Sequence, residues 1–257
     1  MVLIDHQKCI GCGRCEADCV AENIRLEGGK AVCEGPCILC GHCVSCCPAG
    51  AVSIPEYDMT EVETFDKDRF SLDIDRLLYT IKARRSIRQY APKPVEREKL
   101  ERIVQAGRYT ATGGNRQGCH FIVVQEELSR FKEIIWNGIE STEKSAEAIQ
   151  SALKRFVNMR ERGIDFLFRD APAVLFIAAE SPVDAGLAAQ NMELAAISQG
   201  LGALYNGYLV YAANMNPEAR EWLDTKNKPI SVCMLFGYPR VSYSRTAPRR
   251  TADVRWR

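Results

Sequence analysis

Cys9-Ile-Gly-Cys12-Gly-Arg-Cys15-Glu-Ala-Asp-Cys19 and Cys37-Ile-Leu-Cys40-Gly-His-Cys43-Val-Ser-Cys46-Cys47-Pro48 share one cysteine spacing, C-x2-C-x2-C-x3-C. Bacterial runs that bind iron–sulfur clusters have this spacing, with a proline after the fourth cysteine. Two runs therefore predict two 4Fe–4S clusters. In such pairs the fourth cysteine of each run ligates the other cluster. The predicted ligand sets are Cys9, Cys12, Cys15 and Cys47 for one cluster, and Cys37, Cys40, Cys43 and Cys19 for the other.

Disulfides and structural zinc are the alternative uses of so many cysteines. Disulfides need an oxidising compartment, and the start Met1-Val-Leu-Ile-Asp5 lacks the basic region and apolar stretch of a secretory signal. Zinc sites usually pair two C-x2-C knuckles rather than two four-cysteine runs. The doubled spacing favours clusters and leaves zinc as the main alternative.

Four cysteines stand outside the two runs. Cys33 and Cys46 could in principle compete as cluster ligands, but neither fits the repeat. A free cysteine is commonly a small buried hydrophobe. We expect that role for all four, namely Cys33, Cys46, Cys119 and Cys233.

Cysteine density also divides the chain, because ten of its twelve cysteines precede residue 48. The two runs, each followed by a short apolar segment, resemble a bacterial-type ferredoxin with two clusters over about residues 1–55. Residues 56–70 are polar and acidic, which indicates an exposed linker. Residues 71–257 are enough to bury a core of their own. We therefore expect two domains, 1–55 and 71–257.

Charge and hydropathy exclude several function classes. The net charge of the 257 residues is +1, so no long-range field favours nucleic acid or an anionic membrane. No run approaches the 18 apolar residues of a membrane-spanning helix. We expect a cytoplasmic protein that binds neither nucleic acid nor membrane.

Periodicity in the larger domain predicts helices flanking a small sheet. Apolar spacing indicates helices over 74–83, 94–107 and 184–199, and strands over 119–125, 172–179 and 229–237. Residues 127–162 form a long charged helical stretch that we expect to break at Gly138 and again near residue 141. The predicted fold class is α+β, a layered domain with a central sheet flanked by helices.

Four segments of this domain carry chemical cues. Arg84-Arg85-Ser86-Ile87-Arg88 offers guanidiniums and a hydroxyl that suit a phosphate, although a solvated basic helix end is the alternative. Asn115 and Gln117 lie in a Gly-rich loop and could read the edge of a heterocycle, although Gly-Gly-Asn also makes an ordinary turn. The other two are the alanine-rich stretch 184–207 and the basic pair Arg249-Arg250.

In this order and at these separations, the four segments resemble the FMN-dependent nitroreductase family over about residues 74–256. The resemblance implies that Arg84, Arg85, Ser86 and Arg249 or Arg250 hold the phosphate and ribityl chain. It places Arg88 beside the flavin pyrimidine and Asn115 and Gln117 at the ring edge. The backbone of Leu204, Tyr205, Asn206 and Gly207 would lie near the flavin N5. It also implies a homodimer.

Together the two domains predict an iron–sulfur flavoprotein oxidoreductase. Reduced ferredoxin or a similar carrier, or else NAD(P)H, would supply electrons, and the clusters would pass them to FMN. The acceptor would be an electron-poor small molecule such as a nitroarene, quinone or enone. Flavin would carry the chemistry, without a catalytic side chain. One alternative is an electron-transfer protein whose acceptor is another protein. The other is a specialised chemistry such as reductive dehalogenation, with residues 136–170 as a lid.

Overall fold

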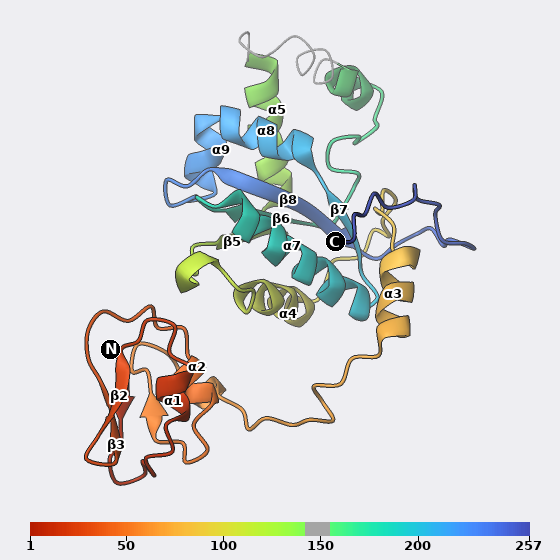
Figure 1. Cartoon of the computed structure of the whole chain (residues 1–257). Helices are drawn as coiled ribbons and strands as arrows, with labels where there is room; N and C mark the ends of the chain where they lie inside the picture. The colour runs from red at the N-terminus through yellow and green to blue at the C-terminus, as the bar shows by residue number, and fades with distance from the viewer. Residues whose placement is uncertain (142–154) are drawn as a thin grey trace. The chain divides into compact units, whose positions relative to one another are not determined.

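The computed structural model describes residues 1–141 and 155–257, and the chain folds as two compact units (Figure 1). The first unit contains Met1–Leu72 and also Thr112–Arg116. The second contains Asp73–Ala111 and Gln117–Arg257. The loop predicted to read the flavin edge is therefore divided, with Asn115 in the first unit and Gln117 in the second.

The first unit is built from two similar halves. Its pairing is antiparallel, β1 with β4 and β2 with β3. Short helices α1 and α2 begin 28 residues apart, and each follows a glycine in the left-handed region, Gly13 (φ 73°) or Gly41 (φ 77°). Glycine adopts this conformation without strain. The elements are β1 (Leu3–Ile4), α1 (Arg14–Ala17), β2 (Ile24–Glu27), β3 (Lys30–Cys33), α2 (His42–Ser45), β4 (Val52–Ser53) and a 3-10 turn η1 (Met59–Glu61).

The second unit has a four-stranded antiparallel sheet in the order β5-β6-β8-β7. Its strands are β5 (His120–Val124), β6 (Ala173–Ala178), β7 (Gly202–Tyr205) and β8 (Ile230–Gly237). Its helices are α3 (Ile74–Ala83), α4 (Arg97–Arg108), α5 (Leu128–Ser141), α7 (Pro182–Ser198), α8 (Gly207–Met215) and α9 (Pro217–Trp222). The 3-10 turn η2 (Gly113–Asn115) follows α4 in the sequence but belongs to the first unit. Residues 155–161 are also helical.

Helices cover both faces of this sheet (Figure 1). Every residue of β6 is buried, and alternate side chains of a strand point to opposite faces. Val174 and Phe176 pack with residues of α5, α8 and α9. Leu175 and Ile177 pack with residues of α4 and α7. The predicted layered α+β domain is confirmed.

Most expected elements are confirmed to within a few residues, but the break at Gly138 is wrong. Gly138 lies inside α5. A Cβ added there would stand 2.2 Å from Nδ2 of Asn216. This glycine therefore permits the close approach of α5 to the start of α9, and helix packing outweighs its low helix propensity.

Strand β7 and helices α8 and α9 were not predicted from the sequence. A four-residue strand that starts at Gly202 has too few alternating residues to show a period. The strand forms because it pairs with β8, with Ala203 opposite Phe236. Tertiary pairing therefore decided this segment.

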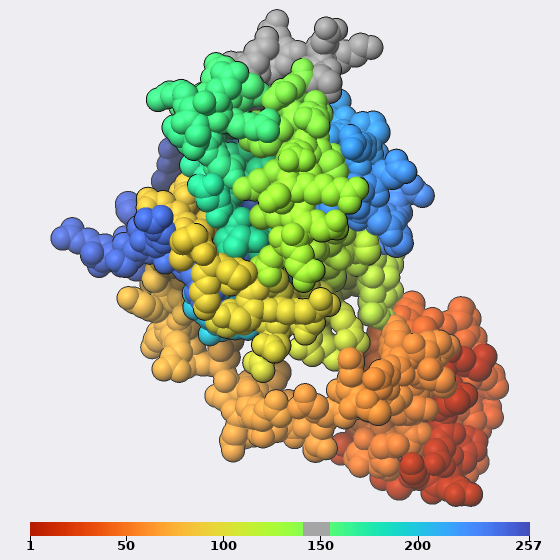
Figure 2. Space-filling view, turned by 180° about the vertical axis from the view of Figure 1, so that it is seen from behind, coloured from red at the N-terminus to blue at the C-terminus, as the bar shows by residue number. Residues whose placement is uncertain are grey.

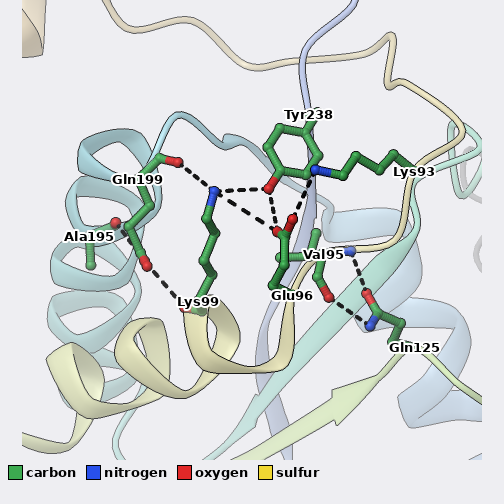
Figure 3. A network of polar contacts seen from close by, with 8 residues as sticks. All are labelled: Lys93, Val95, Glu96, Lys99, Gln125, Ala195, Gln199 and Tyr238. Atoms are coloured by element: carbon green, nitrogen blue, oxygen red, sulfur yellow. Dashed lines mark hydrogen bonds and ion pairs between the residues drawn. The ribbon is translucent and has the colours of Figure 1, made fainter.

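A polar network fixes the start of α4 against three other elements (Figure 3). Lys99 Nζ donates to the hydroxyl of Tyr238 (2.8 Å) and to the carbonyl of Gln199 (3.1 Å). The Tyr238 hydroxyl donates to Glu96, and the Val95 backbone exchanges hydrogen bonds with the Gln125 amide. Hydrogen bonds from Lys93 and then Tyr238 lower the pKa of Glu96 to about 2. The network thus remains charged at neutral pH and joins the ends of β5, α7 and β8.

The expected lid over 136–170 falls partly on residues 142–154, which lie outside the described residues. Its described parts belong to the second unit's core, where Phe156, Leu167 and Phe168 are buried. Arg160 pairs with Glu140 (3.0 Å) and lies over the ring of Trp136. In Figure 2 the surface of α5 (yellow-green) adjoins that of the segment that begins at residue 155 (bluish green).

Within residues 1–141 and 155–257, no helix has the length and apolar composition needed to cross a membrane.

Replacing Asn216 tests the junction between α5 and α9. Its side chain caps α9 by accepting from the Ala219 N–H (3.2 Å) and donates to the Ile134 carbonyl of α5 (2.9 Å), and it is buried. We expect Asn216→Ala to lower the free energy of unfolding by about 2 kcal/mol, because a cap and a buried acceptor both lose their partner. Asn216→Ser keeps a capping oxygen and should lose less. Urea unfolding measures both, and equal losses would contradict the capping role.

Candidate functional site

Two cavities in the first unit divide the cysteines of the repeat. Each is lined by the four cysteines that the sequence assigns to one cluster. One cavity has Cys9, Cys12, Cys15 and Cys47 in its wall. The other has Cys19, Cys37, Cys40 and Cys43, together with Cys33. Each fourth cysteine thus faces the cavity of the other run, as the predicted exchange requires.

Backbone N–H groups point at sulfur in the same way in both halves. The N–H of Asn23 donates to Cys19 Sγ (3.4 Å), and 28 residues later the N–H of Ala51 donates to Cys47 Sγ (3.3 Å). Further donors reach Cys9 Sγ from Ala31 (3.4 Å) and Cys37 Sγ from Leu39 (3.3 Å). Such bonds stabilise thiolates and tune the potential of a bound cluster.

The thiols differ in their readiness to ionise. Burial raises the pKa of Cys43 to about 11 and also raises the pKa of Cys15. Hydrogen bonds from the backbone of Ala31 and Gly11 lower the pKa of Cys9. Only thiolates ligate metal, so filling these sites would release protons from the buried cysteines.

The cysteine arrangement fits a multi-iron cluster. A single zinc ion requires its ligands to meet about 2.3 Å from one point, and the part of the chain that the structure describes has no group of three or more His, Cys, Asp or Glu that could hold a metal ion. Here each set of four cysteines lines a cavity. The residues present therefore fit two four-iron clusters, and the individual ligand sets remain predictions.

In the second unit, the arginine-rich segment lies beside β7. The N–H of Ile87 donates to the carbonyl of Ala203 (3.0 Å). A Cβ on Gly202 would meet the side chain of Ile87 at 2.3 Å, so glycine is required for this close approach. Segments more than a hundred residues apart are thereby held together, and residues 84–88 run alongside the predicted N5 turn at 204–207.

Arg84 forms a buried ion pair that the sequence analysis missed. Its Nε lies 2.9 Å from Oε1 of Glu193, whose side chain is only 2% exposed. Glu193 comes from α7, and Tyr205 of β7 is close enough that burial and then the Glu193 charge raise the pKa of its hydroxyl. The available signal was an acidic residue in the middle of an alanine-rich helix, Glu193 between Met192 and Leu194.

A second guanidinium joins Arg88 on this side of the unit. Arg88 is exposed, and its Nη1 donates to the Ser86 carbonyl (3.5 Å). Burial, followed by the positive charge of Arg88, lowers the pKa of Arg169. Two neighbouring cations repel each other unless an anion lies between them, so this pair suits an anionic group. Nothing in the sequence around Arg169 distinguished it from other surface arginines.

In the segment 204–207, the side chain of Asn206 faces the interior and Gly207 leaves the backbone open. The Asn206 side chain is buried, accepting from the Leu209 N–H (3.1 Å) and donating to the Leu167 carbonyl (2.7 Å). It therefore caps α8 and faces the interior. At Gly207 an added Cβ would meet nothing within 4 Å, so the first turn of α8 is open to a ligand.

The remaining predicted site residues lie in less defined surroundings. Asn115 donates to the carbonyls of Ile38 and Leu39 (both 2.9 Å), which belong to the same unit as residues 112–116. Arg85 donates to the Lys82 carbonyl at the end of α3. Arg249 and Arg250 are exposed in the segment after β8, where Arg249 donates to the Pro248 carbonyl (3.2 Å). The roles given to these residues and to Gln117 stay predictions.

Comparison with known proteins gives a separate result for each unit. A sequence profile described as "Nitroreductase family" matches residues 81–238. A nitroreductase from Bacteroides fragilis, solved with bound FMN, is 26% identical and superimposes with a TM-score of 0.53, over 69% of this chain and 94% of that one.

Two curated relatives complete the comparison. A Methanothermobacter thermautotrophicus protein, provisionally named NADH dehydrogenase/NAD(P)H nitroreductase, is 28% identical over 51% of this chain. The match spans 60% of that relative's length. A ferredoxin from Methanothermococcus thermolithotrophicus is 37% identical over 59 residues, which are 21% of this chain and 98% of the ferredoxin.

The ion pair between Arg84 and Glu193 can be tested by stability. Arg84→Ala leaves the Glu193 carboxylate buried without its partner, so we expect a loss of about 3 kcal/mol in the free energy of unfolding. Replacing both residues with apolar ones, Arg84→Met with Glu193→Leu, should restore most of that loss. Urea unfolding of the wild type and these two variants decides, and equal losses in the single and double variants would argue against a buried pair.

Proposed function

The chain belongs to the nitroreductase family, and on this basis we propose that it is an FMN-dependent oxidoreductase that receives single electrons through two 4Fe–4S clusters. A reduced ferredoxin or similar carrier is the proposed donor. The proposed acceptor is an electron-poor small molecule such as a nitroarene, quinone or enone. The names of the relatives support NAD(P)H as an alternative reductant.

One observation carries this proposal: the division of eight cysteines between two cavities, with the fourth cysteine exchanged. The ferredoxin relative matches the same part of the sequence. A nitroreductase that takes electrons from NAD(P)H alone has no use for such a unit. We therefore propose that residues 1–55 collect electrons and residues 71–257 use them, with 56–70 as linker.

The proposed FMN site is the side of the second unit where residues 84–88 adjoin 204–207. Arg84, Arg85 and Ser86 would hold the phosphate and ribityl chain with Arg249 or Arg250, because guanidinium forks match phosphate geometry. Arg88, with Arg169 close by, would place positive charge toward the flavin pyrimidine. The open first turn of α8, at Gly207, would offer backbone N–H groups. Asn115 and Gln117 would contact the ring edge.

Bound FMN supplies the redox chemistry, accepting electrons singly and delivering them to the acceptor as a hydride. The chain contributes binding, orientation and charge. The ion pair with Glu193 fixes the position of the Arg84 side chain, and Asn206 caps the start of α8. No side-chain acid is required of this site, because solvent can supply the proton.

The proposed assembly is a homodimer. Helix α3 supports it, because none of its residues is buried within the unit. Its apolar residues Ile74, Leu78 and Ile81 are exposed. An apolar helix stripe usually packs against another surface, and a second copy of the chain would provide one.

FMN retention tests the proposed phosphate site. We expect Arg84→Met/Glu193→Leu/Arg88→Ala to lose most of its FMN on gel filtration while keeping its thermal unfolding midpoint, because the cations are gone and no buried charge is left unpaired. Arg102→Ala, on the exposed surface of α4, is the control and should retain FMN. Unchanged flavin content in the triple variant would refute the assignment.

Cys40→Ala tests the path of the electrons. It removes a predicted ligand of the second cluster, so we expect reduction by ferredoxin to fall at least tenfold. Dithionite-reduced flavin in the same protein should still reduce an acceptor. Cys46→Ala, at a cysteine that lines neither cavity, should leave ferredoxin-driven turnover unchanged. Full ferredoxin activity in Cys40→Ala would contradict the relay.

An anaerobic visible-absorbance titration distinguishes the two possible electron donors. Bleaching of cluster and flavin bands by reduced ferredoxin, with NAD(P)H without effect, is the expected result. Rapid bleaching of the flavin by NAD(P)H would instead make flavin the entry point, with the clusters carrying electrons outward.

A further inference from the structure

The two cavities of the first unit are not equivalent, because one contains a fifth cysteine. Four cysteines line the cavity at Cys9, Cys12, Cys15 and Cys47. The other cavity has those at Cys19, Cys37, Cys40 and Cys43, and also Cys33. Cys33 stands outside the repeated spacing, so the ligand assignment leaves it without a role.

Strand β3 brings Cys33 to this position. Residues two apart on a strand face the same side, and Ala31 and Cys33 occupy that side of β3. Ala31 lines the first cavity and Cys33 the second. One strand thus presents a methyl group to one predicted cluster and a thiol to the other.

The residue equivalent to Cys33 in the first half, Asp5, does not offer an additional thiol to the first cavity. Cys33 lies four residues before Cys37, and Asp5 lies four residues before Cys9. Asp5 is exposed, and its carboxylate accepts from the N–H groups of Gln7 (2.9 Å) and Lys8 (3.3 Å). It does not line the first cavity, so the first site has no thiol at the position equivalent to Cys33.

Cys33 lies next to Cys19, the ligand that comes from outside the loop. The N–H of Asn23 donates to Cys19 Sγ (3.4 Å), and the Asn23 carbonyl accepts from Glu34, the residue after Cys33 (2.8 Å). Ile24, the next residue, pairs with Cys33 in the β2–β3 ladder. The segment that positions Cys19 is therefore hydrogen-bonded to the strand that carries Cys33.

We propose that Cys33 is an exchangeable fifth ligand of the second cluster, which takes the fourth corner when Cys19 leaves it. In the exchange the iron–sulfur bond to Cys19 breaks and one to Cys33 forms. The proton of the Cys33 thiol goes to the Cys19 thiolate, and no electron is gained or lost. The second cluster then keeps four thiolates when Cys19 is lost, whereas the first cluster has no thiol at the equivalent position to replace Cys47. This inference rests on the proposed presence of two clusters.

Cys19 and Cys47 provide a matched pair for the test, because they are equivalent in the repeat and differ in having a fifth cysteine nearby. Iron and acid-labile sulfide are measured per chain after anaerobic purification, with electron paramagnetic resonance of the reduced protein. The wild type should hold about eight irons. Cys19→Ala should keep about eight, whereas Cys47→Ala and Cys19→Ala/Cys33→Ala should each keep about four. Cys19→Ala/Cys46→Ala should keep about eight, which excludes Cys46 as the substitute.

The inference is overturned if Cys19→Ala falls to about four irons, or if Cys19→Ala/Cys33→Ala keeps eight. A wild type without two clusters would instead overturn the proposed function. If Cys19→Ala fails to fold and loses all iron, a chelator challenge of Cys33→Ala and the wild type decides. The second cluster should be stripped several-fold faster from Cys33→Ala, because no fifth thiol recaptures the iron, and equal rates would overturn the proposal.

Discussion

Burial of β6 on both faces is the constraint from which the second unit follows. Six consecutive apolar residues, Ala173–Ala178, are removed from water, and alternate side chains must be covered from opposite sides. Helices α4 and α7 cover one side, and α5, α8 and α9 cover the other. Because β8 pairs with β6 and β7 with β8, the turn at 204–207 is fixed at the end of this layered core. Residues 84–88 then attach to β7, and the proposed flavin site results.

In the first unit the corresponding constraint is one of reach. A tight loop with cysteines three residues apart can serve three corners of a cube, and the fourth ligand must come from elsewhere. Cys19 and Cys47 line the cavity of the other run, so in the proposed clusters each half would receive its fourth ligand from the other half. N–H···S contacts, glycine caps and short helices recur 28 residues apart, as the cysteine spacing does.

Charge in the second unit is organised around Arg84 and Arg88. Glu193 is buried, so it neutralises Arg84 from the protein side and leaves the remaining guanidinium donors for a ligand. The positive charge of Arg88 lowers the pKa of Arg169, after the effect of burial, which favours an anionic group near this pair. Glu193 is thus the residue that combines stability with orientation of the proposed site.

Features that depend on local spacing can be predicted from the amino-acid sequence alone. The cysteine repeat predicted two ligand sets, the apolar period predicted α3, α4 and α7, and the continuous apolar run at 173–178 predicted a buried strand. These patterns are readable because each element carries its own periodicity. The ordered arginine, Gly-rich and alanine-rich segments likewise resemble the nitroreductase family.

Only the tertiary structure decided the features that depend on partners distant in sequence. Strand β7 exists because β8 pairs with it, and Gly138 sits within a helix because Asn216 packs against it. Glu193 and Arg169 gained their roles from Arg84 and Arg88, about a hundred residues away. Cys33 looked like an ordinary buried cysteine until β3 placed it on the second cavity. A sequence specifies side chains and local conformation, but which groups meet across the fold is set by packing the whole chain.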